Sequence, residues 1–150
     1  MTRLLLGKAF AACLVSAGLA VPPASAADLT VTVDGVQSAA GQLVLGLYID
    51  AKTWPKGPAD YTVEVPARQG RVVYVFKDLP PGRYALTGFH DENSDGTMNY
   101  SFIGLPKEGF FFSHDLSPGL SPPGFEACAV TLADTPMAIT VRIQHWGRRL

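Results

Sequence analysis

Residues 28–34 read Asp28-Leu29-Thr30-Val31-Thr32-Val33-Asp34, with apolar and polar side chains in strict alternation. Successive side chains of a β-strand point to opposite faces, and alternation with β-branched residues is typical of a half-buried strand. We therefore expect Leu29, Val31 and Val33 to face a hydrophobic core and the two threonines to face outward. The segment predicts a strand in an all-β domain.

Six further segments have the length and composition of strands, and turn-forming residues separate them. In Leu79-Pro80-Pro81-Gly82-Arg83-Tyr84, a Pro followed by a Gly suits a type II turn. No segment after the first 26 residues has a convincing helical period. Seven short strands favour an antiparallel β-sandwich over a small barrel. The six further segments are residues 42–50, with Leu43, Leu45, Leu47 and Ile49 on one face, and residues 61–65, 71–76, 84–90, 126–132 and 137–144.

The chain begins with the features of a cleaved signal peptide. Two basic residues and an apolar run precede the small-x-small sequence Ala24-Ser25-Ala26. Residues 1–26 are predicted to be the signal peptide, and residues 27–150 a single β-sandwich domain in the periplasm or outside the cell. Cys13 lies within the apolar run and not at the cleavage point, which favours an ordinary secretory signal over a lipid anchor.

Charge and cysteine content exclude some classes of function. The formal net charge is −1, so the chain offers no basic surface for nucleic acid. The apolar run of the leader is too short to span a bilayer comfortably as a permanent helix. We also expect no transmembrane segment in the mature chain. After cleavage only Cys128 remains, so no intramolecular disulfide can form. Strand alternation places Cys128 on one face with Val130 and Leu132, as a small buried hydrophobe and not a nucleophile.

The long connection after residue 90 contains the one sequence that matches an ion site. Asp91-x-Asn93-x-Asp95-Gly96 has the alternating oxygen ligands and the sharp-turn glycine with which an oxygen-ligand calcium loop opens. The bidentate Glu expected at loop position 12 is replaced by Phe102. Glu108 is a remote acid ligand if its turn folds back onto the loop. The candidate calcium ligands in the loop are Asp91, Asn93, Asp95, Thr97 and Asn99.

An Asx-rich turn without an ion is the alternative for residues 91–99, since Asp and Asn side chains bond their own backbone. If calcium binds, only two carboxylates are certain ligands within the loop. The affinity is then expected in the weak extracellular range, about 10⁻⁴ to 10⁻³ M.

Two other hypotheses use the same connection. A small metal-dependent hydrolase would need the polar side chains of His90, Asp91, Glu108 and His114 to converge in one cleft. A carrier would hold an apolar ligand against Phe110–Phe112 in an enclosed cavity.

The aromatic residues of the connection are expected to plug the open end of the sandwich, with a contact surface as the alternative. These residues are Tyr100, Phe102 and Phe110–Phe112. Side chains alternate along an extended segment, so at least one of the three consecutive phenylalanines is expected to be exposed or to lie beneath the acidic loop.

Four motifs in order resemble the exported bacterial family catalogued as domain of unknown function 2141. They are Phe76-x-x-Leu79-Pro80-Pro81-Gly82-x-Tyr84-Ala85, His90-Asp91-x-Asn93-x-Asp95-Gly96, Gly104-x-Pro106-x-Glu108-Gly109 and Pro122-Pro123-x-Phe125-Glu126-x-Cys128. The resemblance implies an exported small β domain without an assigned activity, and it therefore implies no catalytic residues.

This chain departs from that family where Thr97-Met98-Asn99 replaces a Lys-Leu-Asp-like stretch, which removes a charge from the candidate calcium site. It departs again where Phe111-Phe112-Ser113-His114 replaces Gly-Phe-Ser-Asn. The Leu-Pro-Pro-Gly-x-Tyr turn is also similar to that of transthyretin-like and surface-protein B-type sandwich domains, which supports an Ig-like or transthyretin-like fold only.

Together these features predict an exported, non-catalytic binding or structural module whose loop 91–99 is weakly stabilised by calcium. No other cofactor is expected. The expected partner is a protein, a glycan or a small apolar ligand.

Overall fold

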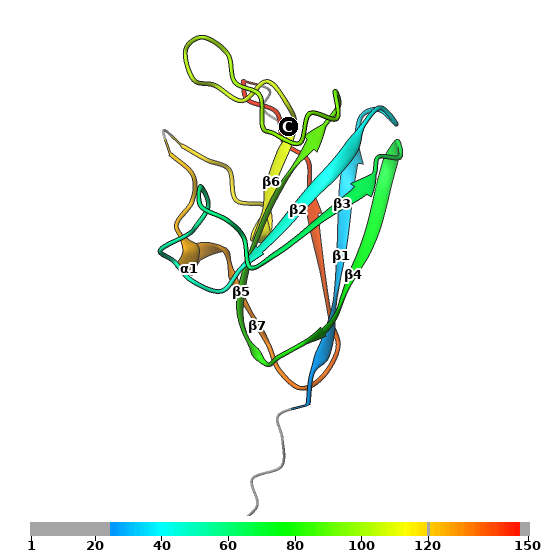
Figure 1. The fold of residues 1–150 in the computed structure, drawn as a ribbon, viewed down its shortest axis with the longest axis vertical. Coiled ribbons are helices and arrows are strands. Elements are labelled where there is room, and N and C mark those ends of the chain that lie inside the picture. The colour runs from blue at the N-terminus through cyan, green and yellow to red at the C-terminus, as the bar shows by residue number, and fades with distance from the viewer. Residues whose placement is uncertain (1–24, 120, 148–150) are drawn as a thin grey trace, which may run out of the picture.

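Two β-sheets pack face to face over residues 25–119 and 121–147, the part of the chain that this computed structural model describes (Figure 1). The predicted signal peptide, residues 1–26, lies outside these residues except for Ser25 and Ala26. Within the described ranges, no helix has the length and apolar character needed to cross a membrane.

The first sheet has the strand order β4-β1-β8. Its strands are β1 (Ala27–Val36), β4 (Gly70–Leu79) and β8 (Met137–Arg142). β1 pairs with β4 in the antiparallel sense and with β8 in the parallel sense. The predicted β-sandwich is confirmed, but this pair makes the first sheet mixed and not purely antiparallel.

The second sheet is built around one long strand, β5 (Gly82–Asp91). One edge of β5 pairs with β2 (Gln42–Tyr48), which continues to β3 (Tyr61–Pro66). The other edge pairs with β6 (Phe110–Phe112) and with β7 (Ala129–Leu132). β2 lies between β3 and β5, so both of its edges are paired. The eighth strand, β6, was not predicted, because three consecutive phenylalanines show no alternation.

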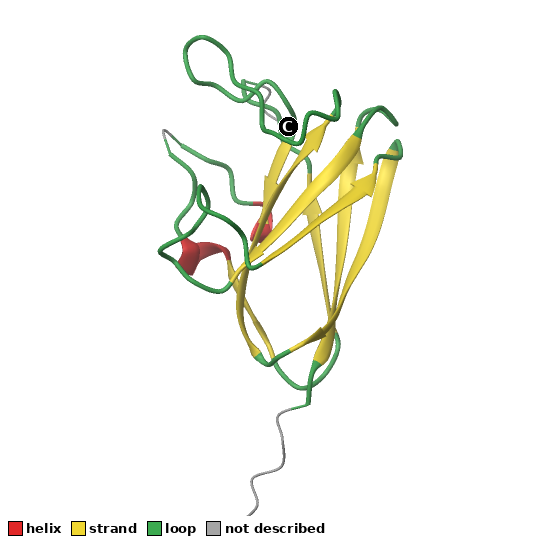
Figure 2. Ribbon diagram, viewed as in Figure 1, coloured by secondary structure: helices red, strands yellow, loops and turns green. Residues whose placement is uncertain are grey.

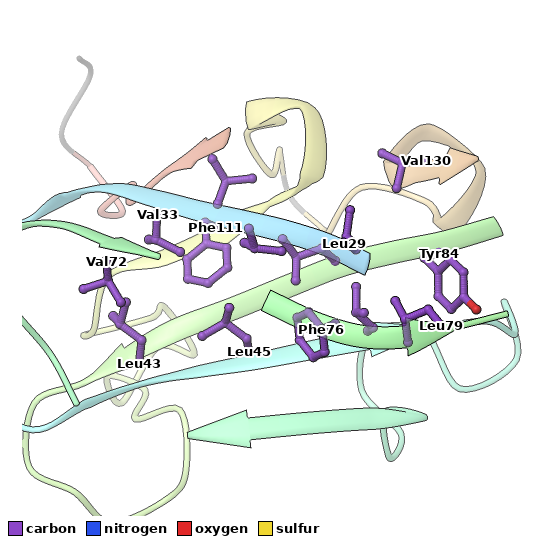
Figure 3. Close-up of a cluster of buried hydrophobic side chains, with 14 of the residues drawn as sticks. Leu29, Val33, Leu43, Leu45, Val72, Phe76, Leu79, Tyr84, Phe111 and Val130 are labelled. Atoms are coloured by element: carbon purple, nitrogen blue, oxygen red, sulfur yellow. The ribbon is translucent and has the colours of Figure 1, made fainter. Parts of the chain in front are cut away.

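The main core lies between the two sheets, and Figure 3 shows side chains from β1, β2, β4 and β5 meeting there around Phe111. Leu29, Val31 and Val33 are fully buried on one face of β1, as predicted. Leu43, Leu45 and Leu47 are likewise buried. Ile49, expected on the same face, is 54% exposed, because β2 ends at Tyr48 and the chain turns away.

A second hydrophobic cluster covers the outer face of the second sheet. Its centre is Trp54, whose ring centroid lies 5.1 Å from that of Tyr48 and 6.0 Å from that of Phe112. The Trp54 indole donates a 2.8 Å hydrogen bond to the carbonyl of Pro123, which ties the β2–β3 connection to the β6–β7 connection. Both connections lie beside the sheet in Figure 2. The buried members of the cluster are Tyr48, Ala85, Phe110, Phe112, Phe125 and Cys128.

Because the sheet is covered on both faces, all three phenylalanines of β6 are buried. Phe111 enters the main core, while Phe110 and Phe112 enter the outer cluster, against which Met98 of the acidic loop also packs. None of the three rings is exposed, so they form no contact surface, but they are buried as a strand of the second sheet and not as a plug at the open end of the sandwich.

The strand predicted over residues 126–132 is wrong in its first half. Residues Phe125–Cys128 form one helical turn, α1, and β7 begins at Ala129. The turn closes with a 3.2 Å hydrogen bond from the Cys128 amide to the carbonyl of Gly124. Cys128 therefore faces the outer cluster, whereas Val130 faces the main core. Burial raises the pKa of the Cys128 thiol to about 11, which fits an inert buried residue.

Gly88 leaves room for the Phe111 ring close to β5, and this contact gives a test of the fold. A Cβ atom at Gly88 would lie 2.3 Å from the Phe111 ring and 2.3 Å from the carbonyl oxygen of Val44. Gly88→Ala should therefore lower the free energy of unfolding by about 3 kcal/mol, the upper range for overpacking a core. Gly119→Ala is the control, since nothing lies within 4 Å of that position. Urea unfolding of both variants measures the difference, and equal stability would contradict this packing.

Candidate functional site

Asp91, the last residue of β5, organises the acidic loop that follows it. Its side chain is fully buried. One carboxylate oxygen, Oδ1, accepts a 3.1 Å hydrogen bond from the amide of Asp95. The other, Oδ2, accepts a 2.8 Å bond from the amide of Gly96 and a 3.2 Å bond from the side chain of Gln42. Three donors thus compensate a charge that would otherwise be costly to bury, and two of them turn the chain back over Asp91.

Asp95 is the centre of a second set of hydrogen bonds at the solvent face of the loop. Its Oδ1 accepts from the amide and the hydroxyl of Thr97, both at 2.9 Å. Its Oδ2 accepts from the side-chain amides of Asn93 and Asn99, again at 2.9 Å. These bonds, that from Asn99 first, lower the pKa of Asp95 to about 2. The carboxylate therefore stays ionised at any physiological pH.

Glu108 closes the loop from its far end, because the Pro106–Gly109 turn does fold back. The amide of Lys107 donates to the carbonyl of Asn99, and the Glu108 carboxylate accepts from the amide of Asn99, both at 2.9 Å. Burial, followed by the charges of Asp91 and Asp95, raises the pKa of Glu108. The negative charges of Asp91 and Asp95 therefore act on Glu108.

His90 precedes Asp91 at the end of β5. Its ring is 1% exposed, with Nε2 2.8 Å from the carbonyl oxygen of Ala40 and Nδ1 3.7 Å from a carboxylate oxygen of Glu92. Its backbone amide donates to the carbonyl of Gly109, which ties the end of β5 to the segment after Glu108.

His114 lies elsewhere. Its ring is 3.4 Å from the carbonyl oxygen of Ala129, which pairs with Ala85. Ala85 is five residues from His90, or about 17 Å along a strand. Asp91 and Glu108 hold the same loop through its backbone amides. His90 and Asp91 are consecutive residues of β5, so their side chains point to opposite faces, and His114 lies at a distance from both.

The five candidate calcium ligands lie in one loop, but as it stands their hydrogen bonds satisfy one another. Asn93 and Asn99 point amide nitrogens, and not oxygens, at Asp95. Among the described residues, no three His, Cys, Asp or Glu side chains gather as a metal centre. An ion here would thus need amide and carbonyl oxygens beside the carboxylates. A flip of the side-chain amides of Asn93 and Asn99 would turn their oxygens, and not their nitrogens, toward the ion.

The loop continues into a projecting turn that we call the apolar tip, defined as Tyr100, Phe102 and Ile103. These side chains are 56%, 101% and 64% exposed. The turn has its own hydrogen bonds: the amides of Ser101 and Gly104 donate to the carbonyls of Leu105 and Ser101, at 2.8 and 2.9 Å. The expectation that Tyr100 and Phe102 plug the sandwich is therefore wrong, because Phe110–Phe112 already fill both clusters.

The sequence did not lead us to expect Ile103 at the site, because we considered only the aromatic and polar residues of this connection. The absence of any charged residue from residues 99–106 could have indicated an apolar segment that includes Ile103. In Figure 1 the loop extends beyond the ends of the strands.

A cleft of about 400 Å³ opens elsewhere, between the diverging ends of β3 and β4. It lies at the edges of the two sheets, away from Phe110–Phe112, where the carrier hypothesis expected a cavity. Aromatic and aliphatic side chains mix with polar ones along it. The lining residues are Asp60, Tyr61, Thr62, Val63, Tyr74, Phe76, Lys77 and Leu79.

Fold and site together define a class: an eight-stranded β-sandwich with a long acidic loop closed by hydrogen bonds and ending in an apolar tip. Residues 31–140 match the family described as "Uncharacterized protein conserved in bacteria (DUF2141)", and the chain belongs to this family. The comparison with curated proteins gave no match, and neither did the comparison with solved structures.

Proposed function

We propose that the protein is an exported, non-catalytic binding module that contacts its partner through the apolar tip. The observation that carries this proposal is the full exposure of Phe102 beside two further exposed apolar side chains. Single exposed hydrophobic residues are common, but a contiguous group on a projecting loop is typical of an interaction site. Export rests on the leader sequence that ends in Ala24-Ser25-Ala26.

The organisation of the loop supports this function. Asp91 and Glu108 hold the base of the loop through its backbone amides, and neither hydrophobic cluster contains a tip residue. Such a base reduces the entropy lost when the tip is ordered against a partner. The tip is therefore preorganised, although the core does not need it.

The hydrolase alternative has less support in the geometry. Its four residues do not converge, since His114 lies beside Ala129. Three donors occupy the carboxylate of Asp91, and His90 is buried against the carbonyl of Ala40. A general acid or base must reach a proton of the substrate, and a residue so enclosed is poorly placed to do so.

Site-specific photocrosslinking in the producing cell tests the binding function. A photoreactive phenylalanine analogue at position 102 should give crosslinked products, because the side chain there contacts a partner. The same analogue at position 49 is the control, since Ile49 is 54% exposed but lies outside the tip. Absence of products from position 102, or equal yields from both positions, would contradict the proposal.

We propose in addition that residues 91–99 bind calcium weakly, with Glu108 as the remote ligand. The charges of Asp91 and Asp95 support this, because they help to raise the pKa of Glu108 and a nearby cation would offset them. The alternating Asp91, Asn93 and Asp95 bring their side chains to one region, as the hydrogen bonds among them require.

Thermal melting in EDTA, calcium and magnesium tests this second proposal. With a dissociation constant of about 10⁻³ M, calcium at about 10 mM should raise the melting temperature by roughly 5 °C, and magnesium should do less. Asp95→Asn should abolish the rise.

Acidification should also weaken the response to calcium, since calcium needs Glu108 ionised. The pKa of Glu108 lies above its ordinary value of 4.5. As the pH falls, the rise in melting temperature caused by calcium should therefore begin to shrink before pH 4.5 is reached, while Asp95 is still ionised. No rise at any calcium concentration up to several millimolar would leave the loop as an Asx-rich turn.

A further inference from the structure

We infer that the partner of the apolar tip is the surface of a lipid bilayer, into which Tyr100, Phe102 and Ile103 insert. This inference rests on the proposed function and names the class of partner. Four independent features of the tip support it: its lack of charge, the hydrogen bonds within its turn, its place in the molecule and its size.

The composition of the tip suits an apolar phase. Residues 99–106 read Asn99-Tyr100-Ser101-Phe102-Ile103-Gly104-Leu105-Pro106 and contain no charged side chain. Charged residues begin again only at Lys107. A segment of this kind can enter the headgroup and upper acyl region without burying a charge, which is the most expensive group to move there.

The backbone of the tip is prepared for the same phase. The amides of Ser101 and Gly104 bond to carbonyl oxygens within the turn, and the amide of Leu105 bonds to the Ser101 hydroxyl at 3.1 Å. Gly104 makes this closure possible, because its φ of +80° is one that side-chain-bearing residues rarely adopt. In lipid, polar backbone groups must be satisfied internally. The hydrogen-bonded turn meets much of this requirement before insertion.

A further aromatic residue lies at the same end of the sandwich. Phe110 and Gln144 exchange backbone hydrogen bonds of 2.9 and 2.8 Å, so the chain reaches Trp146 at the level of the loop base. Trp146 is 37% exposed. Tryptophan and tyrosine favour the boundary between water and hydrocarbon. The tip with Trp146 behind it therefore has the order expected of a loop that enters a membrane end-on.

Size favours a bilayer over a protein partner. Three large side chains expose on the order of 400 Å² of apolar surface, since aromatic side chains offer about 150–250 Å² each. A stable protein interface needs about 800 Å² on each side. The tip also projects beyond the strands (Figure 2), so a flat partner meets only the loop. A bilayer can accept such a tip because it closes around whatever inserts.

The charges behind the tip indicate which lipids it meets. Among the described residues of the loop, Glu92 and Asp95 are exposed acids at its base, and Lys107 is an exposed cation. Asp95 remains ionised because its pKa is about 2. The acidic surplus disfavours an anionic surface, so the structure assigns the tip to a zwitterionic bilayer.

Binding to phosphatidylcholine vesicles tests the inference. The mature protein should cosediment with the vesicles, and lipids brominated in the acyl chains should quench Trp146 fluorescence. The double variant Phe102→Ser with Ile103→Ser should bind at least about tenfold more weakly, because two apolar side chains no longer leave water. The matched control is Ile49→Ser with Val73→Ser, at positions 54% and 53% exposed outside the tip, and its binding should not change.

Melting temperatures of both double variants check that the fold is intact. Absence of vesicle binding by the unaltered protein, or equal binding by the tip variant, would overturn the bilayer as partner. Photocrosslinks from position 102 to a protein would in that case still support the binding module. Absence of both vesicle binding and crosslinks would overturn the two proposals together.

Discussion

The loop that distinguishes this sandwich depends on one buried carboxylate, that of Asp91. An ionised group without access to water is stable only when donors surround it, and here the donors are mainly amides of the next few residues. The chain must therefore double back over the end of β5. Glu108 acts in the same way at the far end of the loop, where its carboxylate accepts a hydrogen bond from the amide of Asn99. The apolar tip projects because both ends of its loop are fixed.

The same strand links the loop to the hydrophobic clusters. β5 pairs with β2 along one edge and with β6 and β7 along the other. Their sheet carries apolar side chains on both faces, and both must be covered. The sandwich partner covers one face, and Trp54 with the β6–β7 connection covers the other. This arrangement buries Phe110, Phe111 and Phe112 in the two clusters. Tyr100 and Phe102, further up the same connection, are left for solvent or for a partner.

Alternation of apolar and polar residues made a strand predictable where one of its faces is turned to solvent, as in β1. It did not do so where both faces of a strand are buried. β6 is uniformly apolar, and Cys128 ends a helical turn that the pattern of the neighbouring residues does not predict. For the site, hydrogen bonds link Asp91, Asn93 and Asp95, and the Pro106–Gly109 turn brings Glu108 to the amide of Asn99. Their binding of calcium stays a prediction. The separation of His114 and the exposure of Phe102 depend on pairing between distant segments, which local patterns do not contain.

Amide hydrogen exchange measured by NMR tests most directly whether Asp91 and Glu108 hold the loop. The amides of Gly96 and Asn99 should exchange much more slowly than those of Phe102 and Ile103, since the two carboxylates accept their hydrogen bonds. In Asp91→Ala the protection of Gly96 should disappear, while amides in the middle of β1 remain protected. Exchange of Gly96 and Asn99 as fast as that of the tip in the unaltered protein would contradict a fixed loop.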